Sequence, residues 1–310
     1  MSKIKYVSKR FRASSLQVIE EVNTIIAEYQ DGGYDLTLRQ LYYQFVARDS
    51  FPDNRRWRWT GRKWVKDPNG TKNADPNYKW LGGLINNARL AGLIDWYAIV
   101  DRTRVLRGNS NWESPQELIE SCVDRFRLNT RATQPHYLEV WVEKDALVGV
   151  LKPICTELDV DYFSCRGYVS QSAMWRAAQR IQYEQSPIIL HLGDHDPSGI
   201  DMTRDIQSRL NQFGCHVDVK RIALNMDQID ELSPPPNPAK VTDSRYDAYR
   251  VEYGNESWEL DALDPRTITD LIETFVNKYT DQEARDILLT EQRAHRQSLQ
   301  SIVDSWEDLV

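Results

Sequence analysis

The chain has 310 residues, 41% hydrophobic and 27% charged, which is typical of soluble globular proteins, and no apolar run approaches the ~20 residues that a membrane span requires. Its four cysteines lie far apart without a CxxC motif, so we expect reduced thiols in a cytoplasmic protein rather than a zinc site or disulfides. The net charge of −7 is uneven: residues 1–72 hold 14 Lys and Arg against 8 Asp and Glu, or +6, which leaves −13 for residues 73–310. The basic front end indicates contact with a polyanion.

The first hundred residues are predicted to be mainly helical. Apolar side chains recur at helical spacing in three segments, residues 14–30, 37–48 and about 77–91. Thr37 or Asp35 is expected to cap the second helix, because both have side-chain oxygens that accept from the first free N–H groups. A strand-like segment, residues 94–101, follows the third helix.

A segment rich in arginine and tryptophan separates the second and third predicted helices. Its core, residues 57–64, alternates basic and aromatic side chains around a Thr-Gly turn and predicts a two-stranded hairpin with an exposed basic face. Trp57, Trp59 and Trp64 either stack on exposed bases or pack on the domain. Three helices with a basic hairpin resemble a winged-helix (CAP-like) DNA-binding domain, in which a hairpin at this position is an insertion. Six cations are predicted to contact DNA phosphates: Arg55, Arg56, Arg58, Arg62, Lys63 and Lys66.

Strands and helices alternate from about residue 135 onward. Apolar strands are predicted at residues 137–142, 160–164, 187–193 and 217–223, with helices between them at 145–157, 170–184 and 199–213. This alternation predicts an α/β fold with a doubly wound parallel sheet that helices cover on both faces. Residues 266–308 are expected to add C-terminal helices. The expected domains are residues 1–130 and 131–310.

Three acidic residues follow predicted strands at the end where ligands bind in open α/β sheets. Glu143 follows the first strand, and Asp194 and Asp196 follow the third. Positions i and i+2 of an extended chain point the same way, so both aspartates share one side. Carboxylates this close repel one another unless a cation compensates them, and hard oxygen ligands suit Mg²⁺ or Mn²⁺. Ser198 is expected to cap the next helix, with Asp201 completing a capping box.

The motifs that contain these acids, VEKDAL and GDHDPSG, resemble the Toprim signature of a Glu after the first strand and a DxD after the third. The DxDP form is similar to that of the type IIB topoisomerase A family, which comprises the A subunit of topoisomerase VI and the meiotic double-strand-break proteins. The segment CRGYVSQS resembles the family's glycine-containing turn, and Glu259 in WELDAL resembles the acid of a later motif. A strand there would put Glu259 and Asp261 on one polar face.

The same family cuts DNA with a tyrosine in an R-x-x-Y/F-Y motif, and this sequence contains RQLYY from Arg39 to Tyr43. The resemblance assigns the nucleophile to Tyr43. Helical geometry separately places Tyr42 on the apolar face and turns Tyr43 ~100° away from it, one turn from Arg39. Arg39 is expected to contact the scissile phosphate, because a phenol with a pKa near ~10 needs a cation or base close by.

The resemblance implies Mg²⁺-dependent DNA cleavage through a 5′-phosphotyrosyl bond, with each active site shared across a homodimer on double-stranded DNA. The segment before Tyr43 is shorter than in topoisomerase VI, which argues against an ATPase B subunit as partner. It favours the short A-subunit-only relatives known as mini-A, of prokaryotic, phage or mobile-element origin. Two other interpretations stay open: a Toprim nuclease that uses metal-activated water, and a non-catalytic DNA-binding or replication accessory protein.

Overall fold

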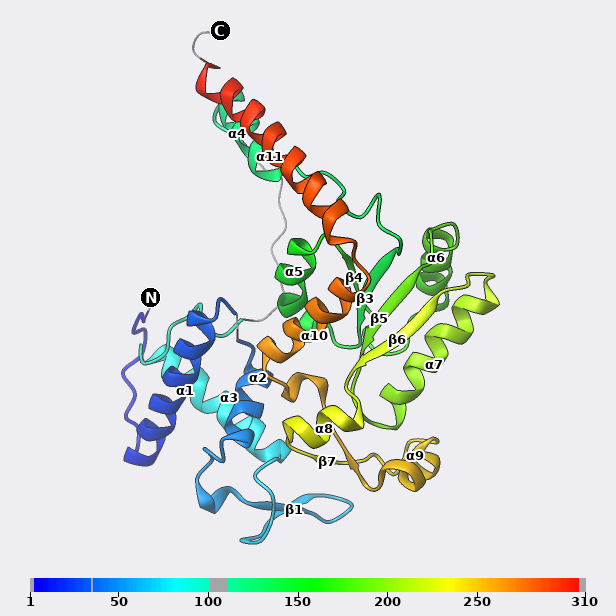
Figure 1. Cartoon of the computed structure of the whole chain (residues 1–310). Coiled ribbons are helices and arrows are strands. Elements are labelled where there is room, and N and C mark those ends of the chain that lie inside the picture. The colour runs from blue at the N-terminus through cyan, green and yellow to red at the C-terminus, as the bar shows by residue number, and fades with distance from the viewer. Residues whose placement is uncertain (1–2, 35, 101–110, 307–310) are drawn as a thin grey trace.

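The fold is built on a four-stranded parallel sheet (Figure 1). A computed structural model describes residues 3–34, 36–100 and 111–306. The strands lie in the order β4-β3-β5-β6, and each pair is parallel. Their bounds agree with the predicted segments to within one residue at either end: β3 Leu138–Val142, β4 Asp161–Ser164, β5 Ile188–Leu192 and β6 Asp218–Ala223. The predicted α/β class with a parallel sheet is therefore confirmed.

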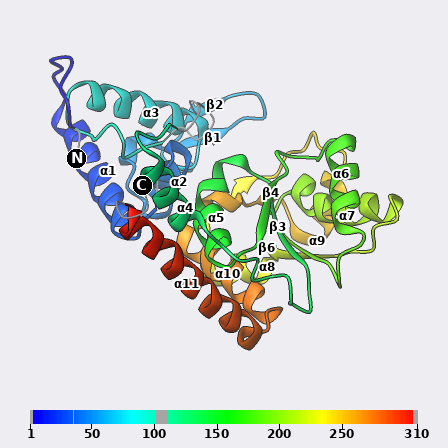
Figure 2. The same cartoon turned by 90° about the horizontal axis from the view of Figure 1, so that it is seen from above.

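Helices cover both faces of the sheet because successive strand residues point to opposite sides. Val140 and Val142 of β3 pack towards α5 (Val148–Glu157) and α10 (Pro265–Lys278), which follow the short helices η2 (Asp145–Leu147) and η3 (Leu260–Ala262). Trp141, between these valines, packs towards α6 (Gln171–Ile181) and α7 (Pro197–Gln212) on the other face. Figure 2 shows the two helix pairs on either side of the strands.

A second core holds the N-terminal helices together. The helices are α1 (Ala13–Asp31), α2 (Leu38–Ala47) and α3 (Asp75–Leu90), as predicted to within about two residues, and Val22, Phe45 and Leu81 are among their fully buried side chains. Thr37 caps α2 in a capping box with Gln40. The hairpin of β1 (Trp57–Trp59) and β2 (Trp64–Lys66) lies between α2 and α3, preceded by η1 (Asp53–Arg55).

The strand predicted at residues 94–101 is wrong for the part that the structure describes. Residues 94–100 form turns with one isolated bridge, in which the Val100 N–H donates to the Leu36 carbonyl at 2.9 Å. Apolar side chains here fill the N-terminal core without a neighbouring strand, so the hydrophobic pattern is satisfied by packing alone. Asp101 and Asp35, the other candidate cap of α2, lie outside the described residues.

The last long helix, α11 (Gln282–Asp304), extends away from the sheet and pairs with α4 (Pro115–Arg125) (Figure 1). The Arg296 side chain donates to the Phe126 carbonyl, and the Leu128 N–H donates to the Gln292 side chain at 2.8 Å. The remaining elements lie below the sheet in the view of Figure 1: α8 (Met226–Leu232), β7 (Asn237–Pro238), α9 (Tyr246–Tyr253) and β8 (Glu256–Ser257). Among the described helices, none combines the length and apolarity needed to cross a membrane.

One buried charge in the sheet leads to a stability prediction. Glu139 on β3 is 1% exposed, and it accepts two bonds from Arg180 at 2.7 and 2.9 Å, one from Trp141 Nε1 and one from the Tyr137 hydroxyl. We expect Arg180→Met to lower the free energy of unfolding by about 1–3 kcal/mol, because it removes two of the bonds that satisfy a buried carboxylate. Urea unfolding measures this change. Arg176→Met, which alters an exposed arginine on the same helix, is the control, and equal stability of both variants would contradict the prediction.

Candidate active site

The three predicted acids lie in loops at the carboxyl ends of β3 and β5. Glu143 Oε2 accepts from the Asp194 N–H at 2.9 Å. A Cβ added to Gly199 would stand 2.2 Å from the Asp194 carbonyl oxygen and 3.1 Å from Glu143 Oε2, so only glycine permits this approach. Asp196 Oδ1 accepts from the Gly199 N–H at 2.6 Å, which makes Asp196 the N-cap of α7. The structure therefore gathers the loops that carry all three acids.

The expectation that Ser198 caps α7 is wrong. Asp196 takes the cap position, and the Ser198 hydroxyl donates to its Oδ1 at 2.9 Å. Pro197 occupies the first position of the helix, where its missing N–H costs nothing, so the residue before it becomes the cap. Asp201 bonds to Tyr168 and Arg204 instead of completing a capping box.

Lys144, which sequence reasoning did not assign, is the cation at the centre of the site. Its Nζ lies 2.9 Å from Asp194 Oδ1 and 2.8 Å from Asp261 Oδ1, and it also contacts Glu259 Oε2. Burial alone lowers the pKa of Lys144, but the three carboxylates raise it above its ordinary value, so the ammonium stays charged. Its place directly after Glu143 was the available signal, since the next residue of a strand-end loop also lies near the acids.

Glu259 and Asp261 connect this centre to the N-terminal helices. Arg39 of α2 lies 2.8 Å from Glu259 through Nη2 and 2.8 Å from Asp261 through Nε. The expected strand is wrong, because η3 begins at Leu260, yet both side chains still reach the same cations. Backbone bonds from Trp258 to His195 and from the Leu260 N–H to Asp194 Oδ1 at 2.7 Å hold this segment against the DxD loop.

Tyr43 lies beside Arg39, with the guanidinium carbon 5.9 Å from the ring centroid. Tyr43 is 4% exposed, so the expectation that it turns away from the core is wrong. The N-terminal core and the Arg39 side chain together enclose it. Burial, followed by the charges of Glu259 and Asp261, raises the pKa of Tyr43 to about 12, although Arg39 and Lys144 act in the opposite direction. The phenol is therefore protonated at neutral pH.

Tyr42 is a structural residue, in agreement with its predicted core position. Its hydroxyl donates to Asn73 Oδ1 at 2.8 Å and accepts from the Ala74 N–H at 2.6 Å. Asn73 in turn donates to the Pro236 carbonyl and the Asn237 side chain. These bonds tie α2 to the chain after the hairpin and to β7.

Arg221 of β6, which the sequence analysis did not assign either, binds the backbone of the loop that carries Asp194 and Asp196. Its guanidinium donates to the carbonyl oxygens of Gly193 at 2.9 Å, Asp194 at 2.6 Å and Gly199 at 2.9 Å. Burial lowers the pKa of Arg221 to about 10, so it remains a cation at neutral pH. The strand also carries Asp218 and Lys220, so nothing in the sequence singled out Arg221 among its charged residues.

The charges of the site do not balance. Burial raises the pKa of Glu143 and raises that of Asp194 to about 8, with Lys144 acting against the shift. The formal charge is −2 when all eight groups that meet here are ionised: Glu143, Asp194, Asp196, Glu259, Asp261, Arg39, Lys144 and Arg221.

Carboxylate oxygens suit a divalent cation such as Mg²⁺ or Mn²⁺, and binding of such a cation would favour the ionised forms of Glu143 and Asp194. Over residues 3–34, 36–100 and 111–306, however, no three acidic, histidine or cysteine side chains are arranged closely enough to hold a metal ion. The residues supply ligands of the kind that such an ion prefers, while Lys144 compensates the acids in the arrangement described.

Neither protein-family models, nor curated proteins, nor solved structures match this chain.

The six predicted DNA-contact cations differ in how far they are engaged. Arg55 lies over the Trp80 ring at 3.7 Å, Arg58 pairs with Asp67 at 2.7 Å, and Lys66 lies over Trp57. Arg56 stands 3.9 and 4.0 Å from two aspartates. Arg62 and Lys63 at the hairpin tip make no ion pair or ring contact with the part of the chain that the structure describes.

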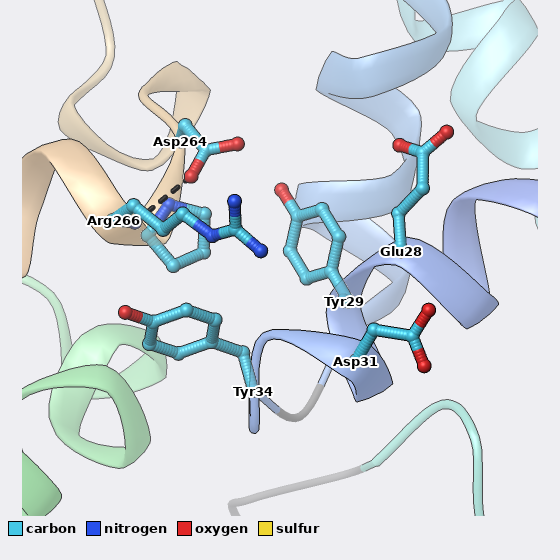
Figure 3. Close-up of a pocket in the computed structure, with 7 residues that line it drawn as sticks. Glu28, Tyr29, Asp31, Tyr34, Asp264 and Arg266 are labelled. Atoms are coloured by element: carbon cyan, nitrogen blue, oxygen red, sulfur yellow. Dashed lines mark hydrogen bonds between the residues drawn. The ribbon is translucent and has the colours of Figure 1, made fainter.

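A separate cavity of about 390 Å³ lies between the end of α1 and the start of α10 (Figure 3). Tyr29 and Arg266 face each other across it, and the Arg266 N–H donates to Asp264 at 2.8 Å. None of the predicted site residues lines this cavity.

Proposed function

We propose that the protein cleaves DNA strands in a Mg²⁺-dependent reaction in which Tyr43 is the nucleophile, as in the type IIB topoisomerase A family that its motifs resemble. One observation carries the proposal: a continuous set of charged contacts runs from Arg39, beside Tyr43, through Glu259 and Asp261 to Lys144 and Asp194. Within one chain, charged contacts thus couple the proposed nucleophile to the proposed metal acids. The N-terminal region is then a winged-helix domain with an inserted hairpin, and the sheet is of Toprim type.

The chemistry is a transesterification. The Tyr43 phenolic oxygen attacks phosphorus, the bond to the 3′ oxygen breaks, and the products are a 5′-phosphotyrosyl bond and a free 3′ hydroxyl. Because the pKa of Tyr43 is raised to about 12, its proton must pass to a base, and Glu259 and Asp261 are the carboxylates whose charges act on the phenol. Arg39 is placed to contact the phosphate. Glu143, Asp194 and Asp196 would hold the metal ion, which stabilises charge on phosphate and leaving oxygens when bound.

The buried position of Tyr43 constrains this proposal. A tyrosine that is 4% exposed reaches a phosphate only when Arg39 releases Glu259 and Asp261. A DNA phosphate competes with those carboxylates for Arg39, so DNA binding favours the arrangement in which Tyr43 is exposed. We propose a homodimer on double-stranded DNA in the cytoplasm, in which the released Tyr43 faces the acids of the other protomer.

A second function is favoured by the same burial. If Tyr43 stays enclosed, the acids can direct metal-activated water at the phosphodiester, and the protein is a Toprim nuclease. If Lys144 compensates the acids permanently, the protein binds DNA without cutting it.

Detergent trapping during reaction on supercoiled plasmid with Mg²⁺ separates the three functions. The proposal predicts protein covalently attached to 5′ ends. Cut DNA with free 5′-phosphate ends supports the nuclease, and bound but uncut DNA supports the accessory protein.

Arg221 gives a test of the acidic loop. We expect Arg221→Lys to weaken Mn²⁺ binding about 10- to 100-fold, because one ammonium cannot bridge the three carbonyls that hold the loop. Isothermal titration calorimetry measures the affinity. Arg204→Lys, which changes an exposed arginine of α7, is the control. Unchanged Mn²⁺ affinity in a folded Arg221→Lys variant would show that loop geometry does not set metal binding.

A further inference from the structure

The β1–β2 hairpin stands out from the body on a fixed base (Figure 1). Trp57 exchanges two backbone bonds with Thr71, both at 2.8 Å, and its Nε1 donates to Asn77 at 2.9 Å. A Cβ on Gly70 would stand 2.3 Å from the Trp57 carbonyl oxygen, which shows how closely the two segments approach. The base is therefore rigid, and the tip, residues 60–63, is presented in a defined direction.

One face of the hairpin is aromatic up to its tip. Trp59 lies opposite Trp64 in the antiparallel register, and their ring centroids are 5.5 Å apart. Trp57 lies on the same face, opposite Lys66, because side chains alternate along a strand. Of the two alternatives raised by the sequence, packing on the domain holds for Trp57, whereas Trp59 remains 45% exposed.

The hairpin segment itself is strongly basic. Residues 54–66 contain six cations and no acid. Arg62 and Lys63, next to the Trp59–Trp64 pair, are exposed and make no ion pair within residues 3–34, 36–100 and 111–306. An exposed indole beside uncompensated cations is the combination that binds a nucleobase together with its flanking phosphates.

Whether Trp59 can stack on a base depends on whether that base is paired. In a paired duplex each base already stacks on its neighbours, so Trp59 gains a stacking contact only where the duplex unstacks. An unpaired base offers a free ring face without that cost. Stacking therefore discriminates between the two forms of DNA, whereas phosphate contacts do not.

We propose that the β1–β2 hairpin recognises unpaired bases in DNA, with Trp59 stacking on the base and Arg62 and Lys63 contacting adjacent phosphates. The inference rests on the proposed function only in taking DNA as the ligand. It requires neither the metal site nor Tyr43.

Fluorescence anisotropy with the full chain in EDTA tests the proposal, using labelled duplexes that are identical except for a short unpaired bulge. We expect the bulged duplex to bind about tenfold more tightly than the paired one. Trp59→Ala should remove this preference and leave affinity for the paired duplex unchanged. Joint substitution of Arg62→Gln and Lys63→Gln should weaken binding to both and reduce the slope of log affinity against log salt by about 2.

Trp175→Ala, which removes an equally exposed tryptophan on α6, is the matched control and should retain the preference. Equal affinity of the unchanged protein for both duplexes would overturn the proposal, as would a preference that survives Trp59→Ala. The proposal would also be overturned if Trp59→Ala weakened binding to the bulged and the paired duplex equally. Tyr43→Phe should keep the bulge preference, so failure of cleavage and failure of base recognition are distinguished.

Discussion

Tyr43→Phe is expected to abolish the covalent protein–DNA adduct, with a loss on the order of 10³-fold or more, because phenylalanine has no oxygen to attack phosphorus. The ring remains, so packing against the N-terminal core should be preserved. Detergent-trapped adducts on supercoiled plasmid measure the effect.

Tyr42→Phe is the matched control, since it removes the neighbouring hydroxyl from the same helix. It should cost about 1–3 kcal/mol of stability, because the Tyr42 hydroxyl satisfies Asn73 and Ala74, but it should leave adduct formation intact at moderate temperature. Cleavage by Tyr43→Phe at the rate of the unchanged protein would rule out Tyr43 as nucleophile and leave the nuclease mechanism.

Lys144→Met is expected to lower the free energy of unfolding by about 3–5 kcal/mol in EDTA, because it leaves buried carboxylates without their cation. Asp194 and Asp261 are 6% and 2% exposed, so water screens them little. Millimolar Mg²⁺ should restore a large part of the loss, since an ion that binds only the folded state stabilises it by mass action. Thermal unfolding with and without Mg²⁺, at equal ionic strength, measures both changes.

Lys152→Met, which changes an exposed lysine on α5, controls for the loss of one positive charge and should show neither effect. The same loss of stability for Lys144→Met with and without Mg²⁺ would contradict a metal site at these acids. This test reads out metal binding without relying on catalysis. It therefore separates a failed metal assignment from a failed assignment of Tyr43.

The pattern of apolar and polar residues along the chain was sufficient to predict the parallel sheet and the acidic residues that follow its strands. The four strands are short apolar runs separated by amphipathic helices, and parallel strands leave their carboxyl ends at one edge. Glu143, Asp194 and Asp196 follow from that rule together with the resemblance of their motifs to the Toprim signature. The cap of α7 was misassigned because Ser198 and Asp196 both have suitable oxygens, and Pro197 decided between them.

The interactions that tie the site to the rest of the chain could not be predicted. Lys144 contacts Asp261 across 117 positions, and Arg39 contacts Glu259 across 220. Side-chain periodicity describes one helix or strand and contains no information on which charges meet from different elements. The burial of Tyr43 has the same origin. Helical periodicity placed Arg39 one turn from Tyr43 but could not show that Glu259 and Asp261 pair with that arginine.

The most direct measurement is identification of the residue that carries DNA. Trapped reaction products would be digested with protease and nuclease, and the peptides that retain a nucleotide would be sequenced by mass spectrometry. The account predicts one modified peptide, with the nucleotide's 5′ phosphate on Tyr43, and its disappearance when Mg²⁺ is replaced by EDTA. A nucleotide on another residue, or cut DNA with free 5′ phosphates and no modified peptide, would contradict it.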